Sequence, residues 1–283
     1  MSGLQTISQR LVLLDEIGQI MDSIKTIALI ETQQSRSSLD SQLQGIHAMR
    51  AATQEFIQGY IPEFMSTRPS HSPRIVLVLG SERGFCGDFN ARLVETLTEK
   101  IESEQLHCEV IPIGYRLWNK LRDTPNTERA ISGANVAAEL EGTLMAVVDV
   151  LAQTETAMDF ESVSVLYHNE RDGVIVFEPL LAGLLNEDAA PATAYPPLIN
   201  LPPAELLKAV ITEYVYSHLH YLLTNSFVAE NEQRVQHLRG ALDRIEEQCS
   251  ALGKQRNQLR QEQITEELEI ILLNGVNEEE SIY

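Results

Sequence analysis

The loop from Ser81 to Asp88 carries the residue types that could support chemistry in this chain. It follows a predicted strand, and α/β proteins often bind ligands or hold a nucleophile at that point. Cys86 could act as a thiolate if Arg83 and the next helix N-terminus lowered its pKa, with His107 or His168 as base. Nothing in the sequence ties either histidine to the loop. We therefore favour a small buried cysteine over a thiol enzyme.

The sequence carries none of the short motifs that bind nucleotides or catalytic metals. A P-loop needs Gly, four residues and then Gly-Lys-Ser/Thr, whereas Gly253-Lys254 is followed by Gln255. The patterns G-x-G-x-x-G, H-E-x-x-H and C-x-x-C are also absent from the sequence. We therefore expect no cofactor and no turnover by this chain alone.

The composition is that of an acidic protein with one hydrophobic core and long helices. Of the 283 residues, 43% are hydrophobic, and the net charge is −20, which makes nucleic acid a poor partner. Three cysteines at unrelated spacings argue against a disulfide framework or a zinc site and fit a reducing cytosol. No run of eighteen apolar residues occurs, and residues 1–10 lack the features of a secretory signal. We expect neither a bilayer span nor an export signal.

An α/β region is predicted in the middle of the chain. A Pro- and Ser-rich linker at 66–73 precedes the apolar run Ile75–Gly80, which indicates a strand buried on both faces. Asp172-Gly173 predicts a hairpin with an antiparallel edge strand at 174–177. Alternating strands and helices imply a mainly parallel, three-layered domain. The other predicted elements are helices at 89–105, 115–122 and 135–152, strands at 108–114 and 163–167, and an irregular loop at 186–200.

Both ends of the chain carry apolar residues at spacings of three and four, as in long helices that need a partner. Pro202-Pro203 reads as a helix start, and a helix to about Leu273 would be roughly 100 Å long. We predict an α/β fold: an antiparallel coiled coil of N- and C-terminal helices (1–65 and 202–283) around an inserted Rossmann-like α/β domain (73–200). Two separate amphipathic helices on a globular core are the alternative. The stripes are Val235, Leu238, Leu242, Ile245, Cys249, Leu252, Arg256, Leu259 and Gln263, and Leu4, Ile7, Leu11, Leu14, Ile17, Met21, Ile24 and Ala28, with one slip between Leu14 and Met21.

The loop and the last helix resemble the gamma subunit of F-type ATP synthases. Residues 81–90 read S-E-R-G-F-C-G-D-F-N, where that family has S-D-R-G-L-C-G-G-L-N. Glu230, Arg234 and Ala241 fit the family's S-E-x-x-A-R-M-x-A-M-x-x-A run, with Leu238 for the second Met. The three matches occur in the family's order and cover nearly the whole chain. The third, N-x-x-R-Q-x-x-I-T-x-E-L, is reproduced by Asn257, Arg260, Gln261, Ile264, Thr265, Glu267 and Leu268.

This resemblance implies a central rotor shaft, a non-catalytic subunit that couples rotation to ATP synthesis or hydrolysis on a ring of alpha and beta subunits. The other partners that it implies are the epsilon subunit and the membrane c-type rotor ring. It places the chain at the cytoplasmic face of the inner or plasma membrane, peripheral and held only through the complex. Ring contacts are implied at Arg260, Gln261, Thr265, Glu267, Asp22 and Ile24, and lower-stalk docking at Arg83, Gly84, Cys86 and Glu31.

The N-terminal helix departs from the basic pattern of this family. In the family, lysines of this helix face acidic loops of the beta subunit, so Asp22 and Glu31 would repel an ordinary partner. We interpret the chain as a divergent gamma subunit, of an alternative ATPase whose ring carries compensating charges. A non-rotary docking adaptor derived from the same family is the alternative. Ile7, Arg10, Ile20 and Ala28 match the family, whereas Gln19, Asp22 and Glu31 replace lysines and Ile24 replaces a Met.

Overall fold

The computed structural model describes residues 3–61, 74–127, 129–153, 162–181, 184 and 197–279, with side chains placed as far as residue 271. The chain divides into two compact units, Met1–Ile27 with Gln236–Tyr283, and Ala28–Val235. The predicted linker at 66–73 lies outside the described residues, as does most of the predicted loop at 186–200. Among the described residues, no helix is long and apolar enough to cross a membrane.

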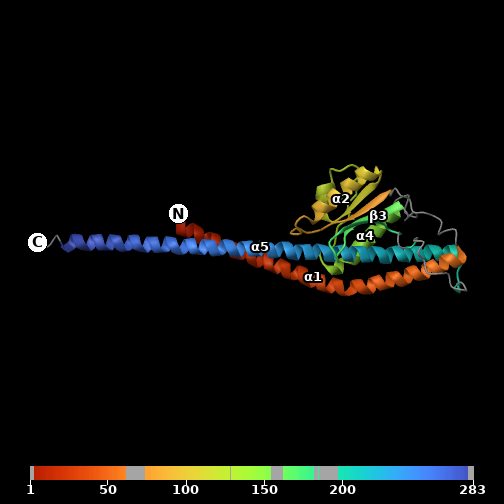
Figure 1. The fold of residues 1–283 in the computed structure, drawn as a ribbon, viewed down its shortest axis with the longest axis horizontal. Helices are drawn as coiled ribbons and strands as arrows, with labels where there is room; N and C mark the ends of the chain where they lie inside the picture. The colour runs from red at the N-terminus through yellow and green to blue at the C-terminus, as the bar shows by residue number, and fades with distance from the viewer. Residues whose placement is uncertain are drawn as a thin grey trace. The chain divides into compact units, whose positions relative to one another are not determined.

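Two long helices hold nearly half of the residues (Figure 1). Helix α1 runs from Gly3 to Tyr60, and helix α5 runs from Pro203 to Glu279. The predicted start of the last helix is confirmed, because proline at the first helical position loses no hydrogen bond that the helix would otherwise make. The helix continues beyond the predicted end near Leu273.

In the first unit, the start of α1 packs against α5 in opposite chain directions. A methyl group at Gly3 would lie 3.8 Å from Leu259 Cδ1, and one at Gly18 would lie 3.8 Å from Ile245 Cγ2. The predicted stripe on α1 was wrong at one position. Ile17 is 38% exposed, and the half-buried Gly18 takes the place facing α5.

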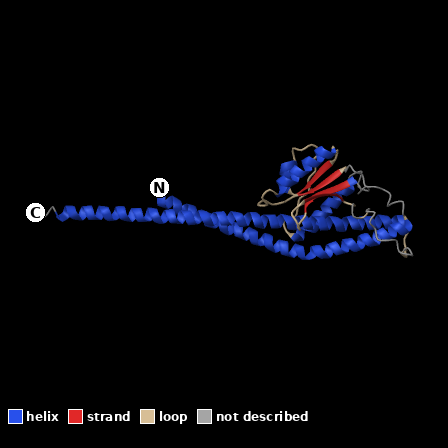
Figure 2. Cartoon of the chain, in the orientation of Figure 1, coloured by secondary structure: helices blue, strands red, loops and turns tan. Residues whose placement is uncertain are grey.

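In the second unit, four strands form one sheet in the order β2-β1-β3-β4 (Figure 2). β1 pairs in parallel with β2 and β3, and β4 pairs antiparallel with β3, which confirms the mainly parallel sheet and its antiparallel edge. The hairpin turns at Gly173, whose φ of +65° favours glycine. The strands are β1 Ile75–Leu79, β2 Glu109–Ile113, β3 Val163–His168 and β4 Ile175–Pro179.

Helices cover both faces of this sheet, as the three-layer prediction required. Leu77, Ile111 and Val165 point to one face and pack with α4 and with residues 214–227 of α5. Val76 and Leu166 point to the other face and pack with α2 and α3. Figure 1 places α2 and α4 on opposite sides of the strands. The covering helices are α2 Phe89–Glu104, α3 Tyr115–Leu121 and α4 Leu140–Gln153, and a short 3-10 turn, η2 Ala137–Glu139, precedes α4.

The outer edge of β2 is occupied by the chain that follows α3. Ile131 forms a parallel bridge with Ile113, and its N–H donates to Pro112 O at 3.0 Å. The N–H of Val110 donates to Asn126 O at 2.9 Å. Pro112 itself has no N–H to offer. The hydrogen-bonding groups of β2 are therefore largely used within this unit.

Two partly or fully buried histidines predict a pH dependence of stability. His168 Nε2 donates to Phe89 O at 3.0 Å and His218 Nδ1 donates to Leu180 O at 2.9 Å, while burial lowers the pKa of both rings. Because the folded pKa is depressed, their contribution is complete above about pH 6.5 and is lost as the pH falls below it. We expect His168→Asn and His218→Gln each to reduce the drop in melting temperature between pH 7 and pH 5.

The exposed His47 provides the control for this measurement. His47→Gln should leave the difference between the two melting temperatures unchanged. An equal drop in wild type, His168→Asn and His218→Gln would show that neither buried ring resists protonation in the fold.

Candidate interaction surfaces

The loop that follows β1 rests on a buried ionic cluster from α5. The Arg234 guanidinium donates to Gly84 O at 3.1 Å, to Asn231 Oδ1 at 2.6 Å and to Cys86 Sγ at 3.1 Å. It also forms an ion pair with Glu230, one helical turn away. Glu230 is 5% exposed and Arg234 is 6% exposed. Each of these buried charges would be strongly destabilising without the other. The cluster also fixes the backbone of the loop, through the hydrogen bond to Gly84 O.

Burial and the neighbouring charges shift the pKa values of Glu230, Arg234 and Cys86. Burial raises the pKa of Glu230 to about 7, against the opposing effect of the Arg234 charge. Burial alone would lower the pKa of Arg234, but the Glu230 charge beside it raises the pKa above its ordinary value. Burial and the Glu230 charge raise the pKa of the Cys86 thiol to about 12. Cys86 is therefore a neutral thiol at physiological pH.

This geometry removes the basis for a thiol enzyme. Arg83, which the hypothesis placed beside the sulfur, directs its Nε to Asn135 Oδ1 at 2.8 Å. His168 contacts the backbone of Phe89, and His107 Nδ1 lies 2.9 Å from Gln105 O. Neither ring has Cys86 as its hydrogen-bond partner in these contacts, and a buried neutral thiol is a poor nucleophile.

Thiol labelling provides a direct check on this environment. Cys86 and Cys108 are buried and burial raises the pKa of both, whereas Cys249 is half-buried. We expect a disulfide reagent at pH 8 to label Cys249 first, with the other two reacting at least tenfold more slowly. In Cys249→Ser the fast phase should disappear. A fast phase that persists in this variant would contradict the buried position of the loop cysteine.

The rest of the loop is held by backbone and side-chain hydrogen bonds. Ser81 N donates to Asn90 Oδ1 at 3.0 Å, and Asn90 Nδ2 donates back to Ser81 Oγ at 2.7 Å. Glu82 Oε2 accepts from Tyr115 N at 2.9 Å and Gly133 N at 2.7 Å. No functional role was predicted for Glu82 or Asn90. The only sequence feature that could have indicated them is their position in and next to the loop that follows β1.

A basic groove of about 440 Å³ opens on the outside of this loop. Arg83 and Gly84 line it, together with Arg116 and Lys120 from α3. Phe85 also lines it, is 50% exposed and has a φ of +67°. Two of the predicted docking residues, Arg83 and Gly84, therefore reach the surface here. Cys86 borders the groove but is 4% exposed, so it supports the loop from within.

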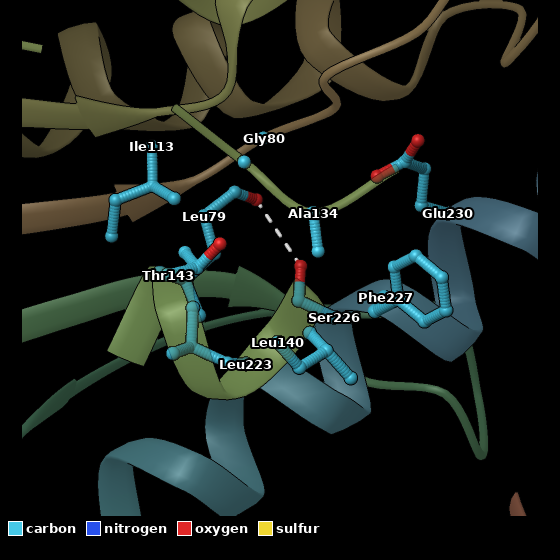
Figure 3. Close-up of a pocket in the computed structure, with 11 residues that line it drawn as sticks. Leu79, Gly80, Ile113, Ala134, Leu140, Thr143, Leu223, Ser226, Phe227 and Glu230 are labelled. Atoms are coloured by element: carbon cyan, nitrogen blue, oxygen red, sulfur yellow. Dashed lines mark hydrogen bonds between the residues drawn. The ribbon is translucent and has the colours of Figure 1, made fainter. Parts of the chain in front are cut away.

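A smaller cavity of about 20 Å³ lies behind the loop, with room for one water molecule. Figure 3 shows Ser226 pointing to Leu79, whose carbonyl accepts from Ser226 Oγ at 3.2 Å, with Glu230 further along α5. Thr143 from α4 completes the polar lining. This volume is too small for an organic ligand or a nucleotide.

In the first unit, a second groove of about 500 Å³ brings together part of the predicted ring contact. Arg260 and Glu267 both line it, so the structure places these two predicted residues on one face of α5, two helical turns apart. Gln261 and Thr265 do not line it. They are exposed on another face of the helix, where Thr265 Oγ1 donates to Gln261 O at 2.9 Å. The other lining residues were not predicted as ring contacts: Leu4, Arg256 and Gln263 were placed in the helix stripes, Ile264 was part of the family motif, and Ser8 was not singled out.

The predicted residues of α1 lie in different environments. Asp22 is 60% exposed and pairs with Lys25 at 2.6 Å, and Ile24 is half-buried. Glu31 is used within the second unit, where its Oε2 accepts from Ala137 N at 2.8 Å at the start of η2. The acidic residue at position 31 thus stabilises a turn of this chain.

Comparisons with known proteins agree with this architecture. The family model described as ATP synthase matches residues 3–273. The ATP synthase gamma chain of Azobacteroides pseudotrichonymphae is 23% identical over 286 residues, covering 95% of this chain and 96% of the relative. The ATP synthase gamma chain of Micrococcus luteus is 26% identical over 283 residues, covering 92% and 93%. The match extends along both long helices and the sheet.

Solved structures with a similar fold come from rotary machines. A chain of the Euglena gracilis mitochondrial ATP synthase, in a structure of its OSCP, F1 and c-ring, has a TM-score of 0.64 at 16% identity, covering 95% of this chain and 92% of that one. A chain of the rotor of the same enzyme has a TM-score of 0.60 at 15% identity, covering 92% and 98%. This chain belongs to the ATP synthase gamma-subunit family, the non-catalytic central rotor stalk.

Proposed function

We propose that this chain turns as a shaft inside a ring of alpha and beta subunits and transmits torque to or from the ATP sites on that ring. The observation that carries this proposal is the family match over residues 3–273, which includes both long helices. In this proposal the ATP sites lie on the other subunits, and energy conversion depends on contacts with them.

The finer architecture is part of this proposal. The packing of Gly3 on Leu259 and of Gly18 on Ile245 supports an antiparallel coiled coil of α1 and α5. The 2-1-3 order of the parallel strands supports a Rossmann-like inserted domain. In this architecture the N-terminal helix occupies residues 1–65, the α/β domain residues 73–200 and the C-terminal helix residues 202–283. The basic groove at Arg83 and Gly84 is then the lower-stalk surface, for an epsilon subunit and a membrane rotor ring at the cytoplasmic face.

The ring contact is proposed at the second groove and the face beside it. Arg260 and Glu267 offer charged hydrogen bonds from the groove, and Gln261 and Thr265 extend the polar surface around α5. Charge-assisted hydrogen bonds of this kind are strong enough to orient a ring and can break and reform in each turn. Asp22 and Ile24 add a contact from α1.

Reconstitution with the alpha and beta subunits of the same machine tests this function. The chain alone should hydrolyse no ATP, and its addition should stimulate hydrolysis by the ring. Arg260→Ala with Gln261→Ala should weaken association about tenfold, or about 1.4 kcal/mol. The matched pair Lys254→Ala with Gln255→Ala, exposed on the same helix, should leave association unchanged.

The same experiment separates the rotor from the adaptor. An adaptor would bind one partner stably without any effect on ATP turnover, and the Arg260/Gln261 variant would bind as well as wild type. The family membership favours the rotor. Failure of the wild-type chain to assemble with its own alpha and beta subunits would overturn the proposed function.

A further inference from the structure

The turn that joins β3 to β4 is attached to both long helices through one arginine. Arg36 Nη2 on α1 donates to Glu170 Oε2 in the turn at 2.9 Å. The same nitrogen forms an ion pair with Glu232 of α5. The turn is bound to α5 a second time, because Glu170 N donates to Asn225 Oδ1 at 2.8 Å. One guanidinium therefore connects the turn to α1 and to α5.

Further charged contacts hold the same turn. Arg171 Nη2 lies 3.6 Å from Asp40 Oδ1, about one helical turn beyond Arg36 on α1, and Arg171 Nε lies 3.6 Å from Glu170 Oε1. From α2, Arg92 donates to Gly173 O at 3.3 Å. All of these residues belong to the second unit. We define the turn node as Arg36, Asp40, Glu170, Arg171, Asn225 and Glu232.

The turn node lies at the end of the sheet that has no direct chain connection to the long helices. The chain enters the sheet at Ile75 and leaves it at Pro179, and the register pairs these two residues with Val163 and Ser164 at the start of β3. Both connections to the long helices therefore begin at this end of the sheet. The turn lies at the opposite end, after His168, where only non-covalent contacts hold the sheet to the helices.

Apolar packing attaches the sheet to α5 more extensively than to α1. Residues 214–227 of α5 form much of the core on one face of the sheet, whereas α1 contributes Ile46 and, at the border of this core, Met49. The Arg234 cluster also joins the loop after β1 to α5, at the same end of the sheet as the turn. The turn node adds a link from this end of the sheet to α1.

The turn node depends on positive charge that is scarce in this chain. Helix α1 carries four basic residues, and the net charge of the chain is −20. Without Arg36, Arg171 would be the only cation of the turn node, beside three carboxylates that repel one another. Arg36 is 50% exposed, and exposed ion pairs contribute little to folding stability. Loss of this charge should therefore open the turn node without unfolding the unit.

We propose that the turn node fastens the far end of the sheet to α1 and α5, so that the α/β domain and these helices turn as one body under load. This inference rests on the proposed function, in which torque passes between the α/β domain and the shaft. A sheet connected to α1 mainly at the end where the chain enters and leaves would tilt against α1 when a force acts on the domain. The turn node opposes this tilt at the other end.

Hydrogen exchange in the chain alone tests whether the turn node holds the turn. We expect Arg36→Gln to speed amide exchange in residues 169–174 by about threefold, because opening of the turn no longer breaks the ion pairs. Exchange in β1 should stay as in wild type. Arg129→Gln is the matched control, since Arg129 is also 50% exposed and lies 3.8 Å from Glu109 at the start of β2.

A double-mutant cycle shows whether Arg36 acts through the turn. Glu170→Gln should speed exchange about as much as Arg36→Gln, and the double variant should add little to either. Higher salt should bring the wild type closer to both variants, because screening weakens partly exposed ion pairs. Unchanged exchange in Glu170→Gln would mean that the pair does not hold the turn, and the inference would be wrong.

Vesicles that contain the complete reconstituted complex test the mechanical role. We expect Arg36→Gln and Glu170→Gln to keep assembly and ATP hydrolysis but to transport only about half as many ions per ATP, because part of each rotation is lost as tilt of the domain. Arg129→Gln should transport as many ions per ATP as wild type. Normal transport in both turn-node variants, despite their faster exchange, would show that the turn node carries no load.

Two further outcomes distinguish this inference from its alternatives. If Arg36→Gln alone transports fewer ions and Glu170→Gln behaves as wild type, Arg36 contacts another subunit and the proposed role of the turn node is wrong. If the wild-type chain neither assembles nor supports transport, the proposed function fails and the mechanical role fails with it. The exchange measurement on the chain alone would then still report whether the turn node forms.

Discussion

Arg234→Met is expected to lower the free energy of unfolding by about 3–5 kcal/mol at pH 8. The substitution leaves the Glu230 carboxylate buried without its cation, and Gly84 O loses its donor. Because Glu230 can then escape the penalty by taking up a proton, the loss should be smaller at pH 5. Urea denaturation of wild type and variant at both pH values measures the effect.

Removal of both charges provides the decisive control. Glu230→Gln combined with Arg234→Met should recover most of the lost stability, because the cost arises from an unpaired buried charge. Arg239→Met, at an exposed position of the same helix, should stay within about 0.5 kcal/mol of wild type. A double variant as unstable as Arg234→Met alone would show that packing of the long side chain matters more than its charge.

Gly80→Ala is expected to lower the free energy of unfolding by about 2–3 kcal/mol, through overpacking. A Cβ at this position would lie 2.4 Å from Leu117 Cβ and 2.8 Å from Asn90 Oδ1. Either α3 must shift or the Ser81–Asn90 hydrogen bonds must lengthen. Thermal unfolding monitored by circular dichroism should give a lower midpoint for the variant.

Gly142 on α4 is the matched control for this substitution. No atom lies within 4 Å of where its Cβ would be, and it is in a helix, where alanine is favoured over glycine. Gly142→Ala should therefore stabilise the protein by up to about 1 kcal/mol. If both glycine variants shift the midpoint in the same direction, the close approach of α3 to the loop is not what constrains Gly80.

The local pattern of the sequence predicted the sheet well. A continuous apolar run such as Ile75–Leu79 has few alternatives once Gly80 ends it, and Asp172-Gly173 specifies a hairpin by its own backbone preferences. Strand and helix ends were within a few residues of the predicted ones. These elements depend on interactions between residues that are close in the sequence, so local residue patterns are enough to predict them.

The residues of the candidate interaction surfaces could not be predicted from their spacing in the sequence alone. Arg260 and Gln261 are neighbours in sequence, yet a helix rotates them about 100° apart and only Arg260 lines the groove. Gly18 was not predicted to face α5, because the pattern was read from apolar side chains and glycine has no side chain. Glu31 was assigned to a partner, whereas its hydrogen bond to Ala137 N joins positions more than a hundred residues apart.

The edge strand β2 affects whether the protein aggregates before it assembles with its partners. Exposed sheet edges recruit strands of other molecules, and this is a common start of aggregation. At β2, Pro112 has no N–H donor, and the bridge from Ile113 to Ile131 leaves few hydrogen-bonding groups for such recruitment. A newly made chain that has not yet assembled is therefore protected at this edge, and a variant that breaks the bridge between Ile113 and Ile131 should precipitate before it loses its helices.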